Sequence, residues 1–371
     1  MKIRINKRKI KYFCIVMIAL LGSLMFHADK TSNLDFIRYQ DVLDSLRNSN
    51  LTLFDYLIYS NTTTKWTNAM LPYAYAFNTL VYFVAKYFRN DYVLSWISTI
   101  IDYTIIAYIA FDWRRESKYR NREVVLIILA CFSLLPFMQV NSGLRTATSA
   151  CVMALALYKY LYQNKSLVLF GILSAISVLF HPFTLFAIPI AIVIKISSSK
   201  SVFIITLIGC MFLSRIAEIF RGSSIPFLRA LAIKYGTYTS AEQFRAYRFC
   251  LYGVLIISII CIMQYLFIYK KSRNNLNTNL SAIVNAKTSS DKDKLYLFII
   301  SFCGLIIGNI GSYEIVVRNG YLLGALSPVM ISIFFENRSD TNLSFVTRML
   351  IWAIVCFMTL EYIRYHYAFF I

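Results

Sequence analysis

The sequence predicts an all-α, polytopic integral membrane protein with about 11 (10 to 12) transmembrane helices. Three observations lead to this fold class. Hydrophobic residues make up 58% of the 371 residues and charged residues only 15%, whereas soluble domains are about 25% charged. The apolar residues come in long runs, and the mean hydropathy of the chain is +0.59. The net charge of +20 falls between those runs, which is typical of a polytopic membrane protein and not of a nucleic-acid binder.

The apolar segments approach or reach the roughly 17 to 20 helical residues that a bilayer core requires. The first segment follows a basic stretch between Lys2 and Lys11. Met25, Phe26 and His27 offer no small-residue cleavage site, so we expect an uncleaved signal anchor with a cytoplasmic N-terminus. The twelve segments are 12–26, 70–87, 92–111, 124–140, 146–162, 166–180, 183–196, 201–220, 248–269, 295–312, 320–335 and 345–360.

The positive-inside rule orients these segments. Basic residues are concentrated at 114–122 and 270–294, and both stretches are expected to be cytoplasmic. The opposite, periplasmic side then receives the loops 27–69 and 221–247. We interpret the whole chain, 1–371, as a single polytopic domain of the bacterial cytoplasmic (inner) membrane. Its cytoplasmic loop at 270–294 is rich in Asn, Ser, Thr and Lys, which is typical of a flexible segment.

The first part of the chain does not fit a simple count of crossings. If both 70–87 and 92–111 crossed the membrane, Arg114 would lie outside, against the positive-inside rule. Segment 70–87 contains Pro72 and Lys86, and we expect it to be a re-entrant or interfacial helix. In the first periplasmic loop, apolar residues at helical spacing predict a short helix on the membrane surface, at Leu51, Phe54, Leu57 and Ile58.

Polar and ionisable residues at the rims of membrane spans are costly, so they are candidates for function. Under the predicted orientation these residues meet on the periplasmic side, in a set richer in cations than the positive-inside rule favours. That excess indicates an anionic ligand, such as a lipid-linked diphosphate. Simpler roles stay open for each residue: a helix-end anchor, a capping residue or a surface ion pair. The candidates are Asp35, Arg38, Tyr39, Asn141, Arg145, His181, Arg245, Glu314, Arg318 and Tyr321.

The central block of the chain resembles the EpsG/Wzy-like polysaccharide polymerases. Residues 144–189 read LRTATSACVMALALYKYLYQNKSLVLFGILSAISVLFHPFTLFAIP. This block has an Arg that opens a small-residue helix, a polar turn, an apolar helix, and then His and Pro before another apolar run. The spacing from Asp35 to Tyr39 and the late Arg318 ahead of Tyr321 also resemble the family's pattern.

This resemblance implies a glycosyltransferase that joins undecaprenyl-diphosphate-linked oligosaccharide repeat units into O-antigen, capsule or exopolysaccharide at the periplasmic face. Arg145 and Arg318 would stabilise the leaving diphosphate through guanidinium contacts. His181 or Asp35 would accept the proton of the attacking sugar hydroxyl, and imidazole is slightly favoured because it titrates near neutral pH. Substrate contacts are expected from Arg38, Tyr39, Asn141, Glu314, Tyr321 and Arg245.

The sequence offers no motif for a metal or a nucleotide. His27, His181 and His366 are its three histidines, and no Asp-x-Asp, Glu-x-x-His or glycine-rich phosphate loop accompanies them. We therefore expect a metal-independent enzyme without a cofactor. The expected partners are the lipid-linked glycan donor and acceptor and membrane lipid, with a chain-length regulator and a flippase as further candidates, and no nucleic acid. Two alternatives stay open: another polyprenyl-phosphate-dependent glycosyltransferase that relies on Asp29 or Asp35, and a transporter or flippase of lipid-linked glycans.

Overall fold

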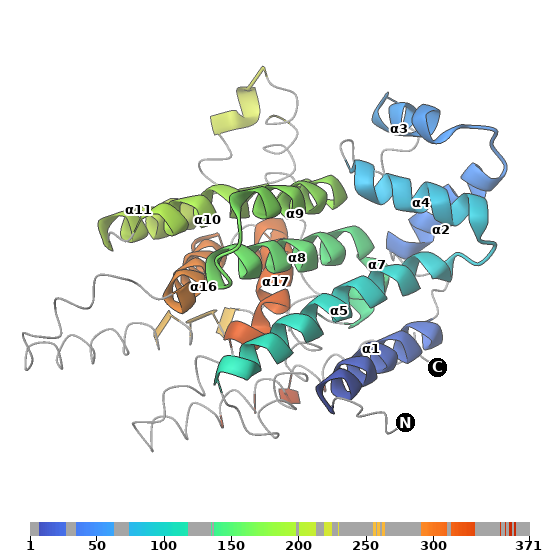
Figure 1. Ribbon diagram of the computed structural model, residues 1–371. Coiled ribbons are helices and arrows are strands. Elements are labelled where there is room, and N and C mark those ends of the chain that lie inside the picture. Colours follow the sequence, from blue (N-terminus) through green and yellow to red (C-terminus); the bar gives the residue numbers. More distant parts are fainter. Residues whose placement is uncertain are drawn as a thin grey trace, which may run out of the picture.

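All the regular structure in the described part of the chain is helical, which agrees with the all-α prediction (Figure 1). The computed structural model describes residues 7–26, 35–62, 74–117, 137–197, 200–212, 219–224, 291–309 and 313–330, with isolated positions elsewhere.

Most of the described helices coincide with the predicted apolar segments. Within these elements η1 is a π-helix, and η2 and η3 are 3₁₀-helices. In chain order the elements are α1 (Lys7–Met25), α2 (Asp35–Arg47), α3 (Leu53–Thr62), α4 (Tyr75–Tyr87), α5 (Tyr92–Ser117), α7 (Phe137–Ser142), α8 (Leu144–Leu157), η1 (Tyr158–Tyr162), α9 (Leu167–Phe180), η2 (Pro182–Phe186), α10 (Ala187–Ile196), α11 (Lys200–Met211), η3 (Phe220–Gly222), α16 (Asp291–Gly308) and α17 (Tyr313–Ala325).

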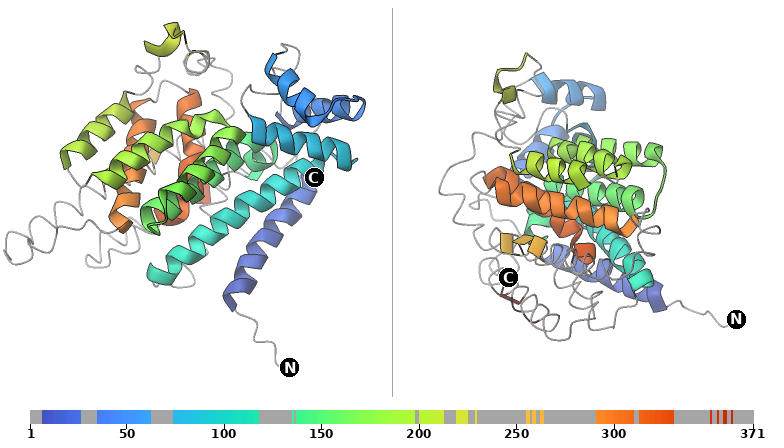
Figure 2. Two further views of the ribbon diagram at one scale, coloured as in Figure 1. Left: turned by 45° about the horizontal axis from the view of Figure 1, so that its top comes forward. Right: turned by 90° about the vertical axis from the view of Figure 1, so that its left-hand side faces the viewer.

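Helices α1 and α5 lie side by side and run in opposite directions (Figure 2). The end of α1 meets the start of α5, where the rings of Phe26 and Tyr92 are 6.2 Å apart. Further along, Ile15 of α1 packs with Phe111 near the end of α5. The start of α1 and the end of α5 therefore lie at the same end of the bundle. We call this the basic end, because the predicted cytoplasmic charges flank it, and we call the opposite one the site end.

Helices α2, α3 and α4 pack together over the site end and are called the cap (Figure 1). Apolar side chains of α2 at helical spacing, such as Phe36 and Leu43, are buried in one cluster with Phe77 of α4 and Leu144 at the start of α8. Helix α4 has 13 residues and is therefore only about 20 Å long. Since it lies within the cap, α1 and α5 are the helices that run between the two ends in this part of the chain.

The core of the bundle is α8, which has α5, α9 and α17 as neighbours. Its small residues, including Ala147, Ala150 and Ala154, are fully buried and allow close helix packing. At the basic end the chain turns through Asn164, whose φ of 52° is tolerated by Asn, and α9 runs back beside α8. The stacked rings of Tyr160 and Phe170, 4.4 Å apart, hold this hairpin together.

Two glycines bring α16 against α11. A Cβ added at Gly304 would overlap the Leu207 side chain, and one added at Gly308 would overlap the backbone of Met211. The spacing Gly-x-x-x-Gly therefore lets the two helices approach closely. Asn309 strengthens the contact by donating from Nδ2 to the Cys210 carbonyl oxygen at 3.0 Å.

The last described helix begins earlier than predicted. The predicted apolar segments end at 312 and begin again at 320, but α17 begins at Tyr313. Arg318 is therefore carried by a helix and not by a loop. Helix α16 likewise begins at Asp291, four residues before the predicted segment.

One described helical stretch, Tyr92–Trp113 in α5, is long and apolar enough to cross a bilayer. Shorter apolar helices occur at Ile15–Met25, Leu167–Phe180, Pro182–Ile196, Ser201–Met211 and Lys294–Gly308. The number of crossings stays a prediction, as do the loop positions. Residues of segments 124–140, 248–269 and 345–360 and of loops 221–247 and 270–294 lie largely outside the described part of the chain.

Candidate functional site

Three predicted site residues that are far apart in the sequence lie near the site end. Arg145 lies in the first turn of α8, which begins after Gly143 separates it from α7. His181 lies at the junction of α9 and η2, in extended conformation (φ −157°, ψ 124°), and Pro182 follows it as the first residue of η2. Arg318 comes from α17, which packs against both α8 and η2.

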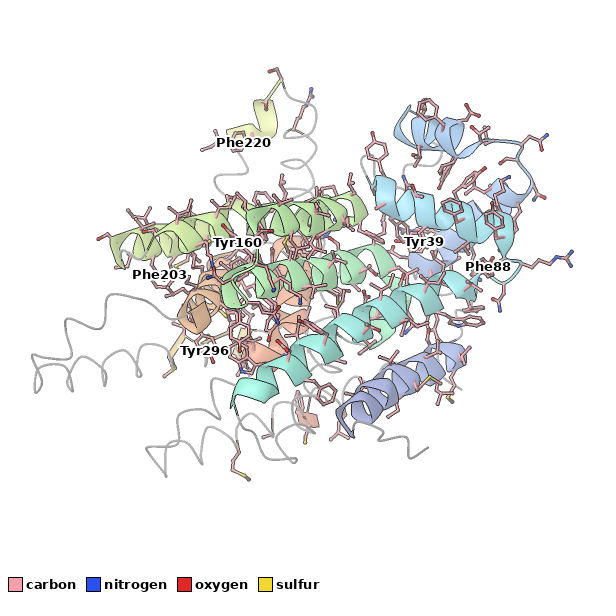
Figure 3. All side chains as sticks on the ribbon, in the orientation of Figure 1. Tyr39, Phe88, Tyr160, Phe203, Phe220 and Tyr296 are labelled. Atoms are coloured by element: carbon pink, nitrogen blue, oxygen red, sulfur yellow. The ribbon has the colours of Figure 1, made fainter. Side chains whose placement is uncertain are left out.

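The Arg145 guanidinium lies against two aromatic rings of the cap. Its carbon Cζ is 5.5 Å from the ring centre of Tyr39 in α2 and 5.7 Å from that of Phe77 in α4. Both rings are buried, and Figure 3 shows Tyr39 at the opposite end of the bundle from Tyr160. Arg145 is itself half-buried, and its Nη1 atom is buried without a hydrogen-bond partner in the described part of the chain. Such an atom favours an anionic acceptor.

The hydroxyl of Tyr39 shares this environment. Burial raises the pKa of Tyr39 to about 12, and the positive charge of Arg145 opposes that rise. The phenol is therefore neutral at physiological pH. Tyr39 therefore presents a ring face and a neutral hydroxyl group to Arg145, and it does not balance the positive charge of the guanidinium.

His181 and Arg318 form the second half of the site. His181 is buried, and its Nε2 atom is 3.4 Å from Nη1 of the half-buried Arg318. The backbone N–H of Phe183 donates to His181 Nδ1 at 3.3 Å. A neutral imidazole has one nitrogen that donates and one that accepts, so neutral His181 carries its hydrogen on Nε2. Two N–H donors then face each other, and an anionic oxygen could accept from both.

A group of buried hydroxyls holds the backbone around His181. Ser149 donates to the carbonyl oxygens of Ser177, at 2.8 Å, and of His181, at 3.1 Å. Ser177 donates to Thr184 at 2.9 Å, and Thr184 donates to the His181 carbonyl oxygen at 3.2 Å. Sequence reasoning missed these residues. The signal that could have found them is their spacing, because Ser149 follows Arg145 by one helical turn and Ser177 precedes His181 by one turn.

Asp35 and Arg38 lie on the solvent side of the cap. Arg38 Nη1 is 3.3 Å from Asp35 Oδ1, with about half of each side chain exposed. Such an exposed pair contributes little to stability. Asp35 is four residues before Tyr39, so the two lie on the same face of α2, and the charge of Asp35 contributes to the raised pKa of Tyr39.

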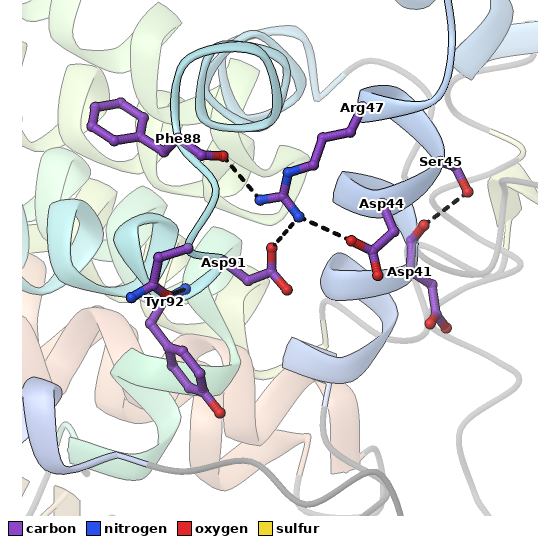
Figure 4. Close-up of polar contacts among 8 residues, drawn as sticks. Asp41, Asp44, Ser45, Arg47, Phe88, Asp91 and Tyr92 are labelled. Carbon is purple, nitrogen blue, oxygen red and sulfur yellow. Dashed lines mark hydrogen bonds and ion pairs between the residues drawn. The ribbon is translucent and has the colours of Figure 1, made fainter.

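The cap is tied to the bundle by a charged clamp (Figure 4). Arg47 at the end of α2 contacts Asp44 at 2.9 Å and Asp91 at 2.6 Å through Nη1, and it donates from Nη2 to the Phe88 carbonyl oxygen at 3.1 Å. Lys86 of α4 donates to two carbonyl oxygens at the end of α2, of Leu46 and Ser49. These contacts join α2 to the turn between α4 and α5, and sequence reasoning did not identify them.

The remaining predicted site residues take no part in the contacts described above. Asn141 is fully buried where α1, α5 and α7 meet, and its Oδ1 accepts from the hydroxyls of Ser23, Ser95 and Thr99. This bonding indicates a structural role for its side-chain oxygen. Tyr321 is buried in the main core on α17. The side chain of Glu314 and the whole of Arg245 lie outside the described residues.

The sequence analysis also passed over Asp102, an acid in the middle of α5. Its side chain is fully buried, Oδ2 accepts from Thr148 of α8 at 3.3 Å, and Oδ1 is buried without a hydrogen-bond partner in the described part of the chain. The rule for ionisable residues in membrane spans would have found it, because Asp102 is the only acid in segment 92–111.

In the described part of the chain, the fold and this site define a class: a helical bundle with one long apolar helix, several shorter apolar helices and a cationic site at one end. A comparison with protein-family models is more specific. The EpsG family model matches residues 10–371, and the chain belongs to this family. The EpsG family is linked to exopolysaccharide biosynthesis, and its proteins are membrane proteins. No curated protein matches the chain, and no solved structure matches it either.

Proposed function

We propose that this protein is a polymerase that joins undecaprenyl-diphosphate-linked oligosaccharide repeat units into a surface polysaccharide. The observation that carries the proposal is the approach of two groups from separate helices, with His181 Nε2 3.4 Å from Arg318 Nη1. A diphosphate oxygen beside this pair could accept a charge-assisted hydrogen bond from each group. Arg145, near the same end, brings a second guanidinium, whose Nη1 atom is buried without a hydrogen-bond partner in the described part of the chain.

In the proposed reaction the growing chain is the donor and the next lipid-linked repeat unit is the acceptor. A hydroxyl oxygen of the acceptor sugar forms a bond to the anomeric carbon of the donor, and the bond from that carbon to the diphosphate oxygen breaks. The bonding electron pair leaves with undecaprenyl diphosphate, whose developing charge is stabilised by Arg145, Arg318 and the Nε2–H of His181. The hydroxyl proton passes to a base and then to water.

We assign the role of base to Asp35. His181 is less suited to it because its Nδ1 lone pair already accepts from Phe183, and its Nε2 then carries a hydrogen. Asp35 is exposed on α2 and can receive a proton and return it to solvent. This assignment keeps both candidates of the sequence analysis in the reaction and gives them different roles.

We also propose that the site end faces the periplasm and that the basic end faces the cytoplasm. The support is that the start of α1 and the end of α5, which carry or adjoin the basic stretches, lie together. The lipid tail of the substrate would then lie along apolar outer surfaces such as that of α9, where Val168 and Ile172 are exposed.

The proposal is tested by measuring polysaccharide chain length in a deletion strain that carries plasmid-borne variants. We expect the deletion to leave single repeat units on their anchor. Arg145→Ala and Arg318→Ala should each reduce chain extension by about a hundredfold or more, the usual cost of removing a donor to a developing oxyanion. Arg89→Ala is the matched control, because Arg89 is exposed at the turn between α4 and α5, and it should extend chains normally.

Membrane amounts of each variant are measured in parallel, so that loss of function is separated from loss of the protein. Wild-type chain length in both Arg variants would overturn the site assignment. Loss of even the single repeat unit in the deletion strain would indicate instead a flippase or an earlier transferase.

A further inference from the structure

We propose that Tyr39 and Phe77 are positioning residues that form an aromatic cage for the Arg145 guanidinium, so that the cap is a working part of the site. The inference deepens the proposed function and rests on it for the role of Arg145. It assigns to Tyr39 the positioning of Arg145, in place of the substrate contact that the sequence predicts.

The cage is built from three helices. The ring centres of Tyr39 and Phe77 are 5.1 Å apart with an interplanar angle of 59°, and the Arg145 Cζ lies within 6 Å of both. A guanidinium at this distance from a ring centre is attracted by the negative face of the ring. Two rings that meet at an angle therefore restrict the guanidinium more than one ring would.

Burial makes this attraction matter more. Tyr39 and Phe77 are almost completely buried, so no layer of water separates the rings from the cation, and cation–π attraction is strongest when the partners are desolvated. The buried, unpaired Nη1 of Arg145 shows that the cage does not saturate the guanidinium. The rings hold its direction, and its Nη1–H group is left for an anionic oxygen.

The cage also depends on how the cap is held. Phe77 packs edge-on to Phe180, at 6.5 Å, and Phe180 is next to His181. The Arg47 and Lys86 contacts fix the end of α2 against α4 and α5. The cap therefore contacts Arg145 directly and also contacts Phe180, the residue that precedes His181. The ring contact with Phe180 and the polar contacts of Arg47 and Lys86 thus hold the cap in a defined position relative to Arg145.

The first test replaces Phe77 by mono-, di- and trifluorophenylalanine, which keep the shape of the ring and progressively weaken its negative face. We expect chain extension by the full-length protein to fall stepwise, by about fivefold for the trifluoro variant. The matched control is the same series at Phe36, an equally buried ring in the same cluster that stacks on Tyr92 and not on the cation. This control should extend chains normally.

The second test does not depend on the reaction. Phenylglyoxal modifies accessible arginines, and peptide mass spectrometry reports how fast Arg145 reacts in the purified protein. We expect Tyr39→Leu to speed the modification of Arg145 at least tenfold, whereas Phe36→Leu should leave the rate unchanged. Tyr39→Phe keeps the ring and loses only the hydroxyl that contacts Arg145, so its effect should be much smaller than that of Tyr39→Leu. Thermal unfolding of each variant confirms that the fold is intact.

The outcomes separate the two proposals. If the protein does not extend chains but Tyr39→Leu exposes Arg145, the cage exists and the proposed function fails. Equal effects of fluorination at Phe77 and Phe36, or an unchanged modification rate in Tyr39→Leu, would overturn the cage. If Tyr39→Leu does not fold, the fluorinated series alone decides, because fluorination hardly alters the size of the ring.

Discussion

At the scale of single residues, Asp102 shows how burial sets the state of an ionisable group. It lies between α5 and α8, with the Thr148 hydroxyl at 3.3 Å and the Cys151 thiol beside it. A carboxylate buried without a cation is very costly, whereas the protonated acid needs only hydrogen-bond partners. We therefore expect Asp102 to be neutral and to connect α5 to α8 through Thr148, which follows Arg145 by one helical turn.

This expectation distinguishes two substitutions. Asp102→Asn keeps the size and polarity of the neutral acid and should change the free energy of unfolding by less than about 0.5 kcal/mol. Asp102→Ala leaves the Thr148 hydroxyl without its acceptor and should cost about 1 to 3 kcal/mol. The measurement is denaturant unfolding of the purified protein in detergent. Equal costs for the two variants would show that the charge of Asp102 is needed.

His181 shows, at the same scale, that residue identity does not fix a chemical role. Its pattern in the sequence fits a general base, since imidazole titrates near neutral pH. The contact from Phe183 to Nδ1 and the position of Arg318 near Nε2 favour a hydrogen-bond donor instead. The difference comes from neighbours that lie 2 and 137 residues away in the chain, and only the first of these is local.

At the scale of elements, the α11–α16 pair gives a sharp prediction about helix approach. Gly308→Ala places a methyl group into the Met211 backbone, and overpacking of this kind costs about 1 to 3 kcal/mol. Gly209→Ala is the matched control, because nothing lies within 4 Å of a Cβ at Gly209. Replacing a helical glycine in open space should stabilise the protein, by about 0.5 to 1 kcal/mol.

Both variants are compared by thermal unfolding in the same detergent. The informative quantity is the difference in stability between the two variants. The substitution is the same in both, and both glycines lie in the contacting helices. A destabilisation of Gly209→Ala as large as that of Gly308→Ala would show that the close approach of α11 and α16 is not the cause.

The cap is the other element-scale feature. The sequence predicts a short helix and an interfacial segment in this region, and the structure has three helices, α2 to α4, in one apolar cluster. The clamp between Arg47 and Asp91 is an ion pair, and the spacing of hydrophobic residues gives no information about ion pairs. From sequence alone, the charged residues of the first loop fit a solvated helix face. The contact with Asp91 is not visible there, because Asp91 follows α4 and is far from Arg47 in the chain.

At the scale of the whole molecule, the antiparallel arrangement of α1 and α5 predicts the topology. The start of α1 and the end of α5 share one end of the bundle, so both basic stretches can be cytoplasmic if α4 does not cross. Reporter fusions after Asn50 and Ser223 should therefore give an outside signal, and fusions after Ser117 and Asn275 an inside signal. An outside signal at Ser117 would contradict this arrangement.

Much of the architecture is predictable from the sequence. Long apolar runs require helices in a membrane protein, because every backbone polar group must be paired within its own segment, and α9 and α5 begin within one residue of their predicted segments. The start of α17 is not predictable in this way, because polar residues such as Glu314 and Arg318 lower the hydropathy of a helix without ending it.

By itself, the sequence determined the all-helical class, the position of most helices and the candidate residues Arg145, His181 and Arg318, because these follow from composition and local spacing. Only the tertiary structure decided which candidates meet. It joined Arg145 to Tyr39 and Phe77, brought His181 to Arg318, and buried Asn141 among the hydroxyls of α1 and α5. The physical reason is that the direction of a side chain at a helix end depends on how whole helices pack, and local spacing carries no record of that packing.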